Sequence, residues 1–190
     1  MAVDFARREQ QVWVIAPSSD MRNVYALEEK VHVYRFASFE WPMYEGQRLA
    51  FLPFLAMRQL IKEVDPDVLH IHSPAVLGLI AQCLAWSLHK PVIATHHFMP
   101  GNMSRSLASS TSFNKCVYTY LTWFYNRCTY VTAPTMTALK LLHAHGLLAP
   151  SAVISNGIDL HTFTPGECDP QIRRQRLILS QTLRKKQPFQ

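Results

Sequence analysis

The chain has 190 residues, a length that fits one domain, and 48% are apolar and 11% aromatic, which allows a sizeable core and excludes wholesale disorder. The formal net charge of +6 arises after Asp169, where six Lys and Arg occur without an acid, because residues 1–169 carry 13 charges of each sign. A basic segment of this kind is typical of a solvated linker, so we expect no nucleic-acid partner. Its charge would still favour an anionic membrane surface.

Cysteine usage and the N-terminus indicate a cytoplasmic protein. Four cysteines, Cys83, Cys116, Cys128 and Cys168, are scattered without a C-x-x-C pair, which favours reduced thiols over a zinc ribbon or a disulfide framework. The first residues, MAVDFARREQQ, are charged where a signal peptide would be apolar. No uninterrupted apolar window reaches the roughly 18 residues of a membrane span.

Short β-branched runs alternate with segments of helical length along the chain. The predicted strands are Val12–Pro17, Val31–Phe36, Asp67–His72, Pro91–His96, Thr129–Pro134 and Ala152–Ser155. The predicted helices are Gln47–Val64, Ala75–Leu88, about Ser112–Asn126 and Thr135–Ala144, with a cap at His145-Gly146. Alternation at this spacing requires right-handed crossovers, so the predicted class is α/β: a Rossmann-like parallel sheet with helices on both faces.

Histidines follow two of these strands. His72 ends one strand, and His96 and His97 end the next, where ligands of open parallel sheets bind. His70 shares a strand face with His72, so a backbone carbonyl could satisfy either side chain as well as a ligand could. A zinc site from the three strand-end histidines is an alternative, but no acid or Cys accompanies them at motif spacing, so we predict no metal.

The predicted helix 112–126 is unusually aromatic. Six rings fall within thirteen residues: Phe113, Tyr118, Tyr120, Trp123, Phe124 and Tyr125. One buried helical stripe holds only about three or four apolar positions per two turns. We therefore expect core packing plus a partner surface, with interfacial membrane contact through Tyr and Trp as the alternative.

Four motifs in order carry a resemblance to a known family. They are D-x-L-H-I-H-S-P from Asp67, P-V-I-A-T-H-H-F-M-P-G-N from Pro91, V-T-A-P-T from Val131, and V-I-S-N-G-I-D-x-x-x-F-x-P from Val153. Together they resemble the N-terminal half of a family 4 glycosyltransferase with the GT-B architecture, over residues 3–165. The stretch from Thr95 to Asn102 is also similar to members that glucosylate diacylglycerol.

The resemblance implies roles for particular residues. His97 would face the interdomain cleft near the donor sugar and diphosphate, as the catalytic histidine and a hydrogen-bond donor rather than a base. The acceptor side and cleft lining would come from His72, Ser73, His96, Thr135, Asn156 and Gly157, with Thr135 at a helix N-terminus that favours anions. Asn156-Gly157 would sit at a hinge, although a turn needing positive φ explains this dipeptide equally well.

The resemblance also predicts what the sequence lacks. The family's first strand and its Gly-rich loop would precede Met1, and without that strand the edges of the Val12 and Asp67 strands would pair abnormally or stay exposed. Residues 1–166 would form an acceptor-side domain and residues 167–190 a basic linker toward a donor-binding domain. Full-length relatives would transfer a hexose from a nucleotide sugar to a sugar or lipid acceptor with retention, without a metal or other cofactor.

The predicted function is thus a truncated glycosyltransferase domain that is inactive alone, at the inner face of the membrane if it associates with one. One alternative is a stand-alone acceptor-binding module that acts with a separately encoded donor-binding chain. Another is an unrelated nucleotide-binding α/β protein, which is disfavoured because no G-x-G-x-x-G or G-x-x-x-x-G-K-[ST] loop follows any strand.

Overall fold

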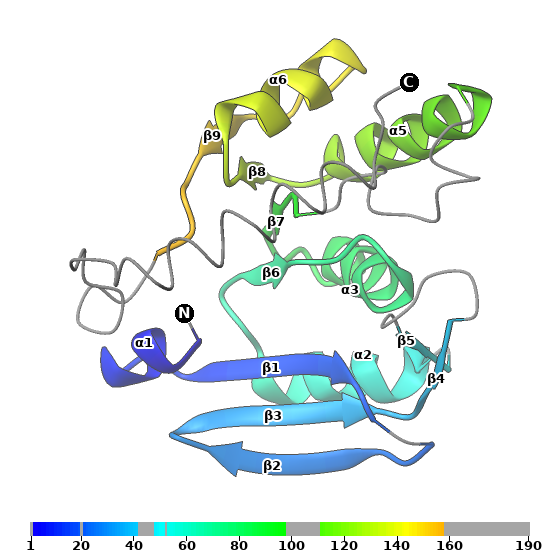
Figure 1. The fold of residues 1–190 in the computed structure, drawn as a ribbon. Coiled ribbons are helices and arrows are strands. Elements are labelled where there is room, and N and C mark those ends of the chain that lie inside the picture. Colours follow the sequence, from blue (N-terminus) through cyan, green and yellow to red (C-terminus); the bar gives the residue numbers. More distant parts are fainter. Residues whose placement is uncertain (1, 20, 42–47, 52, 98–110, 158–190) are drawn as a thin grey trace, which may run out of the picture. The chain divides into compact units, whose positions relative to one another are not determined.

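A computed structural model describes residues 2–19, 21–41, 48–51, 53–97 and 111–157 (Figure 1). Residues 1–155 form one compact unit and residues 156–190 a second. Several features predicted from the sequence lie outside the described residues: the basic linker 167–190, Cys168 and the 98–102 part of the second motif. The other cysteines are free thiols, with Cys83 and Cys116 exposed and Cys128 buried.

The first sheet follows a short helix, α1 (Ala2–Arg7), and has the order β1-β3-β2. As predicted, β1 (Val12–Pro17) and β3 (Val31–Phe36) are parallel strands. The sequence did not predict β2 (Val24–Glu28), which pairs antiparallel with β3. Glu29 and Lys30 join these strands with φ angles of 48° and 67°, the positive values of a tight type I′ hairpin turn, which usually contains Asn or Gly.

A two-stranded antiparallel ladder of β4 (Ser38–Glu40) and β5 (Arg48–Ala50) comes next. The predicted helix 47–64 was therefore wrong at its start, because α2 spans only Phe54–Val64. Pro53 occupies the position before the helix, and a proline inside a helix would lack a hydrogen-bond donor and clash with the preceding turn. Asp65 ends α2 in a left-handed conformation, with its N–H bonded to the Ile61 carbonyl.

The second sheet is wholly parallel, as predicted, with the order β6-β7-β8-β9. Its strands are β6 (Leu69–Ile71), β7 (Val92–Thr95), β8 (Tyr130–Ala133) and β9 (Ser151–Val153). The crossover helices are α3 (Val76–Ser87), α5 (Thr111–Tyr125) and α6 (Met136–Ala144). Gly146 follows α6 with a φ of 100°, which confirms the predicted glycine cap.

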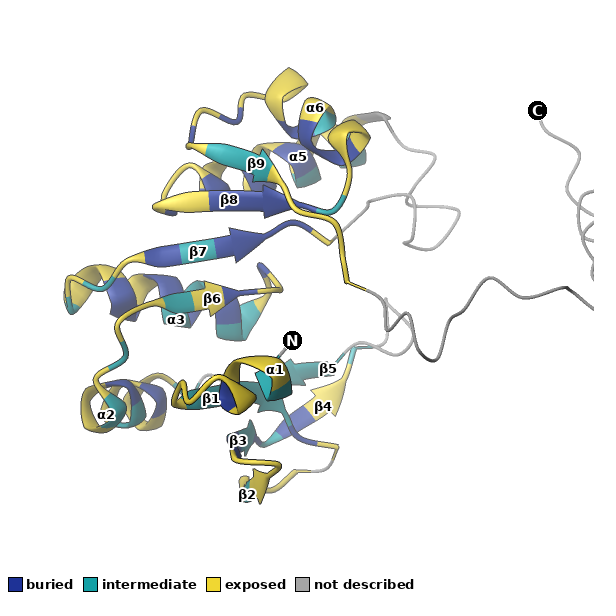
Figure 2. Ribbon diagram, turned by 90° about the vertical axis from the view of Figure 1, so that its left-hand side faces the viewer, coloured by how far each residue is buried: buried dark blue, intermediate teal, exposed yellow. Residues whose placement is uncertain are grey.

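The main core lies between the second sheet and its three helices. Alternate strand residues such as Val92, Ala94 and Val131 face Phe124 of α5 and Leu142 of α6, all fully or almost fully buried. Figure 2 shows this buried band along β7 and β8. The predicted α/β class is therefore confirmed.

A second cluster joins the two sheets. Phe36 of β3 packs with Met57 and Ile61 of α2 and with Ile80 and Leu84 of α3. The strands β1 and β6 do not pair with each other, so each ends its own sheet among the described strands.

Candidate functional site

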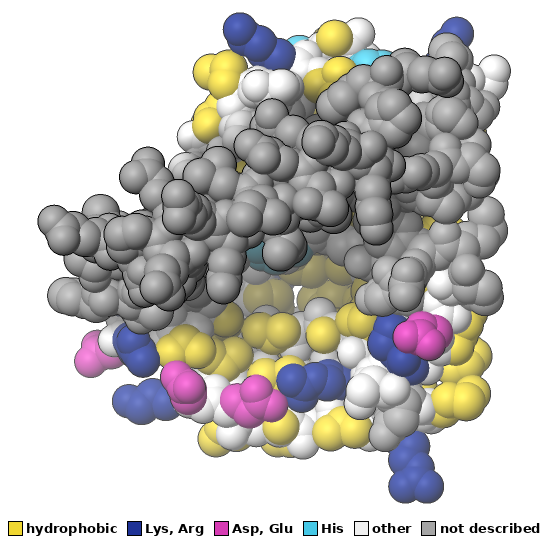
Figure 3. Space-filling model, in the orientation of Figure 1, with side chains coloured by type: hydrophobic (Ala, Val, Ile, Leu, Met, Phe, Trp, Pro, Cys, Tyr) yellow, Lys and Arg dark blue, Asp and Glu magenta, His cyan; other side chains and the backbone are white. Residues whose placement is uncertain are grey.

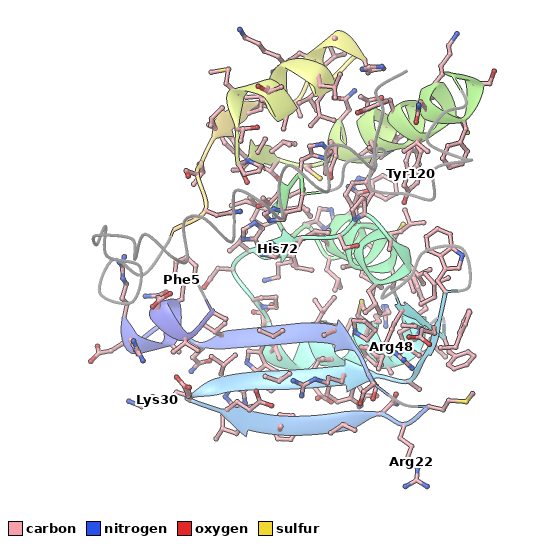
Figure 4. All side chains as sticks on the ribbon, in the orientation of Figure 1. Phe5, Arg22, Lys30, Arg48, His72 and Tyr120 are labelled. Atoms are coloured by element: carbon pink, nitrogen blue, oxygen red, sulfur yellow. The ribbon has the colours of Figure 1, made fainter. Side chains whose placement is uncertain are left out.

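His72 and His97 come together at the carboxyl ends of β6 and β7. Ile71 and Ala94 are partners in the parallel ladder, so the chains leave these two strands side by side. The Nδ1 of His72 lies 3.4 Å from the Nε2 of His97, and the two rings are nearly parallel at 11°. Figure 4 labels His72 at this end of β6, and Figure 3 shows histidine atoms at the back of a hollow above β1. Both side chains are exposed, as a ligand-binding pair requires.

The pair presents two further ring nitrogens to a ligand. Each imidazole ring has two nitrogens, and the contact between the rings uses His72 Nδ1 and His97 Nε2, so His72 Nε2 and His97 Nδ1 are the nitrogens that could bind a ligand. Burial, and then the proximity of His97, lower the pKa of His72, which makes its imidazole neutral at pH 7. The arrangement suits hydrogen bonding to sugar hydroxyls better than charge pairing.

A third histidine, His70, contacts the pair through the ring of His72. Its ring lies 4.2 Å from the His72 ring, centroid to centroid, and its Nε2 lies 2.7 Å from Thr95 Oγ1. Thr95 Oγ1 in turn lies 2.7 Å from Thr132 Oγ1, so a hydrogen-bonded chain crosses β6, β7 and β8. Burial lowers the pKa of His70 to about 4, and the neighbouring histidines add to this effect. A threonine hydroxyl, rather than a backbone carbonyl, therefore satisfies His70.

His96 lies in the core, although we expected it to line the cleft. Neighbouring strand residues face opposite sides, so His96 points toward α5 while His97 is exposed. It is 1% exposed, and its Nδ1 lies 3.2 Å from the hydroxyl of Tyr125. Its Nε2 has no hydrogen-bond partner among the described residues, and burial lowers its pKa to about 4. His96 is thus a buried, neutral side chain that does not line the surface beside His72 and His97.

Ser73 is held by close packing of its loop on α3. A Cβ added to Gly78 would lie 2.0 Å from the Ser73 carbonyl oxygen, so only glycine permits this approach. The Tyr120 hydroxyl donates a hydrogen bond to the Pro74 carbonyl from the side of α5. Gly78 and Tyr120 were not among the predicted site residues. For Gly78 the sequence did contain a signal, because a glycine inside a predicted helix can mark a close approach of another part of the chain.

Thr135 is exposed and caps α6, accepting a hydrogen bond from the Ala138 N–H at 3.2 Å. It follows β8 directly, which places it at the same carboxyl edge as His97. Asn156 and Gly157 are also exposed, but they belong to the second unit. Gly157 does not adopt positive φ, so the alternative explanation of this dipeptide as a left-handed turn is wrong.

Two negative findings apply to the described part of the chain. It contains no group of three or more His, Cys, Asp or Glu side chains placed to hold a metal ion. Its helices are all too short or too polar to cross a bilayer.

Comparisons with known proteins agree with this fold. The model of Glycosyltransferase Family 4 matches residues 1–162. A GDP-mannose-dependent alpha-mannosyltransferase of Mycolicibacterium smegmatis is 26% identical over 175 residues, which cover 90% of this chain and 46% of that protein. A protein of the same description from Mycobacterium tuberculosis is 27% identical over 174 residues, which cover 88% of this chain and 44% of that protein.

The chain thus spans a little under half the length of these curated relatives. The family model nevertheless covers most of its 190 residues, including every strand and histidine of the site. The chain belongs to Glycosyltransferase Family 4.

Proposed function

We propose that residues 1–166 form the acceptor-side wall of a GT-B cleft, in which a hexose passes from a nucleotide sugar to a sugar or lipid acceptor with retention. The observation that supports this most is the exposed His72–His97 pair, 3.4 Å apart at the carboxyl edge of the parallel sheet. The curated relatives are named for GDP-mannose, which makes this the first donor to test. Transfer takes place in the cytoplasm, and at the inner membrane face when the acceptor is a lipid.

His97 acts as a hydrogen-bond donor to the donor sugar, and His72 orients it. An exposed imidazole can hold a sugar hydroxyl in one orientation, and correct orientation accounts for a large share of such rate enhancements. Among the described residues, the printed contacts of the pair are with each other and with the imidazole of His70, and neutral imidazoles do not neutralise a departing diphosphate. Stabilisation of that charge must come from a donor-binding domain placed opposite.

The proposed function can be tested by fusing the chain to a donor-binding domain. The donor-binding half of the M. smegmatis relative would be fused after Pro165, and transfer of radiolabelled mannose from GDP-mannose to membrane lipid extracts and to sugar acceptors would be measured. We expect transfer by the fusion and none by the 190-residue chain alone. Turnover by the purified chain alone would contradict the need for a second wall. No transfer by a folded fusion with GDP-mannose, GDP-glucose or UDP-glucose would contradict the proposed function.

The stand-alone acceptor module with a separately encoded donor chain makes a different prediction. The purified chain would capture a donor-binding protein in a pull-down and gain activity from it. Thermal-shift titration with nucleotides distinguishes the remaining alternative, because a nucleotide-binding α/β protein would be stabilised by its ligand through mass action.

A further inference from the structure

The central part of the sequence contains no acidic residue. From Val68 to Ile158 there is no Asp or Glu, whereas Lys90, Arg105, Lys115, Arg127 and Lys140 are positively charged. Residues 1–67, by contrast, carry ten acids and eight bases. The whole second sheet with α3, α5 and α6 falls within the acid-free span. Its electrostatic potential therefore favours anionic partners over cationic ones.

Exposed aromatic side chains gather on the two helices α3 and α5 of this region. Trp86 of α3 is 85% exposed, and Trp123 and Tyr120 of α5 are 42% and 38% exposed. Single exposed apolar residues need no explanation, but two tryptophans and a tyrosine on adjacent helices do. The remaining rings Tyr118, Phe124 and Tyr125 of α5 are buried, so this helix has a core face and a separate aromatic outer face.

A hydrogen bond between the helices indicates that these side chains lie near one another. Buried Gln82 of α3 donates to the Phe124 carbonyl at 2.9 Å, so α3 and α5 lie side by side at this level. Trp86 lies one helical turn beyond Gln82, and Trp123 directly precedes Phe124. Figure 4 shows Tyr120 reaching from α5 toward α3. We call the surface formed by Trp86, Tyr120, Trp123 and Arg127 the aromatic face.

Cationic groups accompany the rings. The Arg127 guanidinium lies over the Trp123 ring, with Cζ 4.2 Å from the ring centroid, and Tyr120 stacks on Trp123 with 6.0 Å between the ring centroids. Lys115 is exposed on the same helix. Indole and phenol rings beside Lys and Arg match the interface of an anionic bilayer, where the rings sit at headgroup depth and the cations meet phosphate.

We propose that the aromatic face docks the protein on an anionic lipid surface. Charge complementarity favours an anionic lipid surface as the partner. Residues 68–158 contain no carboxylate that would repel lipid phosphate, and the exposed rings can enter the bilayer interface. The docking does not depend on the role of His97, since it uses the outer surfaces of α3 and α5 rather than the carboxyl edge of the sheet. Failure of either proposal therefore leaves the other standing.

The test uses the full chain with vesicles of phosphatidylglycerol or of phosphatidylcholine. We expect sedimentation with phosphatidylglycerol vesicles at low salt and a blue shift of tryptophan emission, with at least a tenfold weaker association for W86A/W123A. The Phe54→Ala variant is the matched control, because Phe54 is an exposed aromatic residue (45%) of α2 in the acid-containing part. Its association should equal that of the wild type.

The basic residues after Asp169 also attract anionic vesicles, so the comparison between variants is the decisive readout. Equal association of W86A/W123A and wild type would overturn the proposal, as would equal association with both lipids. Self-association in the absence of vesicles that W86A/W123A abolishes would also overturn it, because the face would then be an interface between copies. Circular dichroism confirms that each variant is folded.

Discussion

The two sheets of this protein differ in construction and in what their edges carry. The first combines a parallel pair with an antiparallel hairpin strand, and its own small core consists of Ala6, Val31 and Val33 with partly buried neighbours. The second is wholly parallel in its described strands and packs against three helices. Only the second places histidines at the carboxyl ends of neighbouring strands. The comparison teaches that stability and the candidate site are both concentrated in the second sheet.

The largest expected difference concerns the cores. Phe124→Ala removes a fully buried ring from the second sheet's core and should lower the free energy of unfolding by about 3–5 kcal/mol. Leu27→Ala on β2, where the side chain is 62% exposed, should change it by no more than about 0.5 kcal/mol. Urea unfolding followed by circular dichroism measures both. Similar losses for the two variants would refute the unequal division of stability.

Acid should destabilise the second sheet through His96. The folded-state pKa of about 4 lies below the ordinary histidine pKa of 6.5, so the unfolded chain binds more protons between these values. Stability is therefore complete above about pH 6.5 and falls as the pH drops toward 4, by on the order of 3 kcal/mol for this buried side chain.

Urea unfolding at a series of pH values between 7 and 4 measures this slope. The His96→Gln variant, which does not titrate, should show a shallower slope; the remainder comes from groups such as His70, whose pKa is also lowered. An unchanged slope in this variant would show that His96 is not a source of the acid sensitivity.

A smaller effect is expected where the site's loop rests on α3. Gly78→Ala forces a Cβ to within 2.0 Å of the Ser73 carbonyl, so the loop must shift, at a cost of about 1–3 kcal/mol. Gly157→Ala is the matched control, because a Cβ there meets nothing within 4 Å. Thermal unfolding and the histidine NMR signals of His72 report stability and loop position. A Gly78→Ala protein as stable as the control would show that the loop is not fixed by this contact.

The sequence predicted the second sheet better than the first for physical reasons. Parallel strands alternate with helices at regular spacing, and each predicted strand of this sheet ends at a proline, a histidine or a serine, so periodicity and strand ends together predicted β6 to β9. The hairpin of β2 and β3 turns through Glu29-Lys30, which lacks the usual Asn or Gly, and β5 lies in a segment with helical composition. The local sequence therefore gives no signal for the β2–β3 hairpin or for strand β5.

The site was predictable only in part. His72 and His97 follow strands, and strand ends meet at one edge of a parallel sheet, so their proximity could be expected. The bonds from His70 to Thr95 and from Thr95 to Thr132 depend on strand register, and they join residues 25 and 37 positions apart. The burial of His96 against Tyr125 likewise requires knowing where β7 ends relative to α5.

The most direct test of the account compares histidines from the two sheets in the fusion with a donor-binding domain. His97→Ala should reduce the rate of hexose transfer by about 100-fold or more, because it removes a positioned hydrogen-bond donor, and His72→Ala should reduce it less. His32→Ala, which alters a histidine stacked on Trp13 in the first sheet, should leave the rate unchanged. Wild-type activity in a folded His97→Ala protein, or an equal loss in His32→Ala, would contradict the placement of the site on the second sheet.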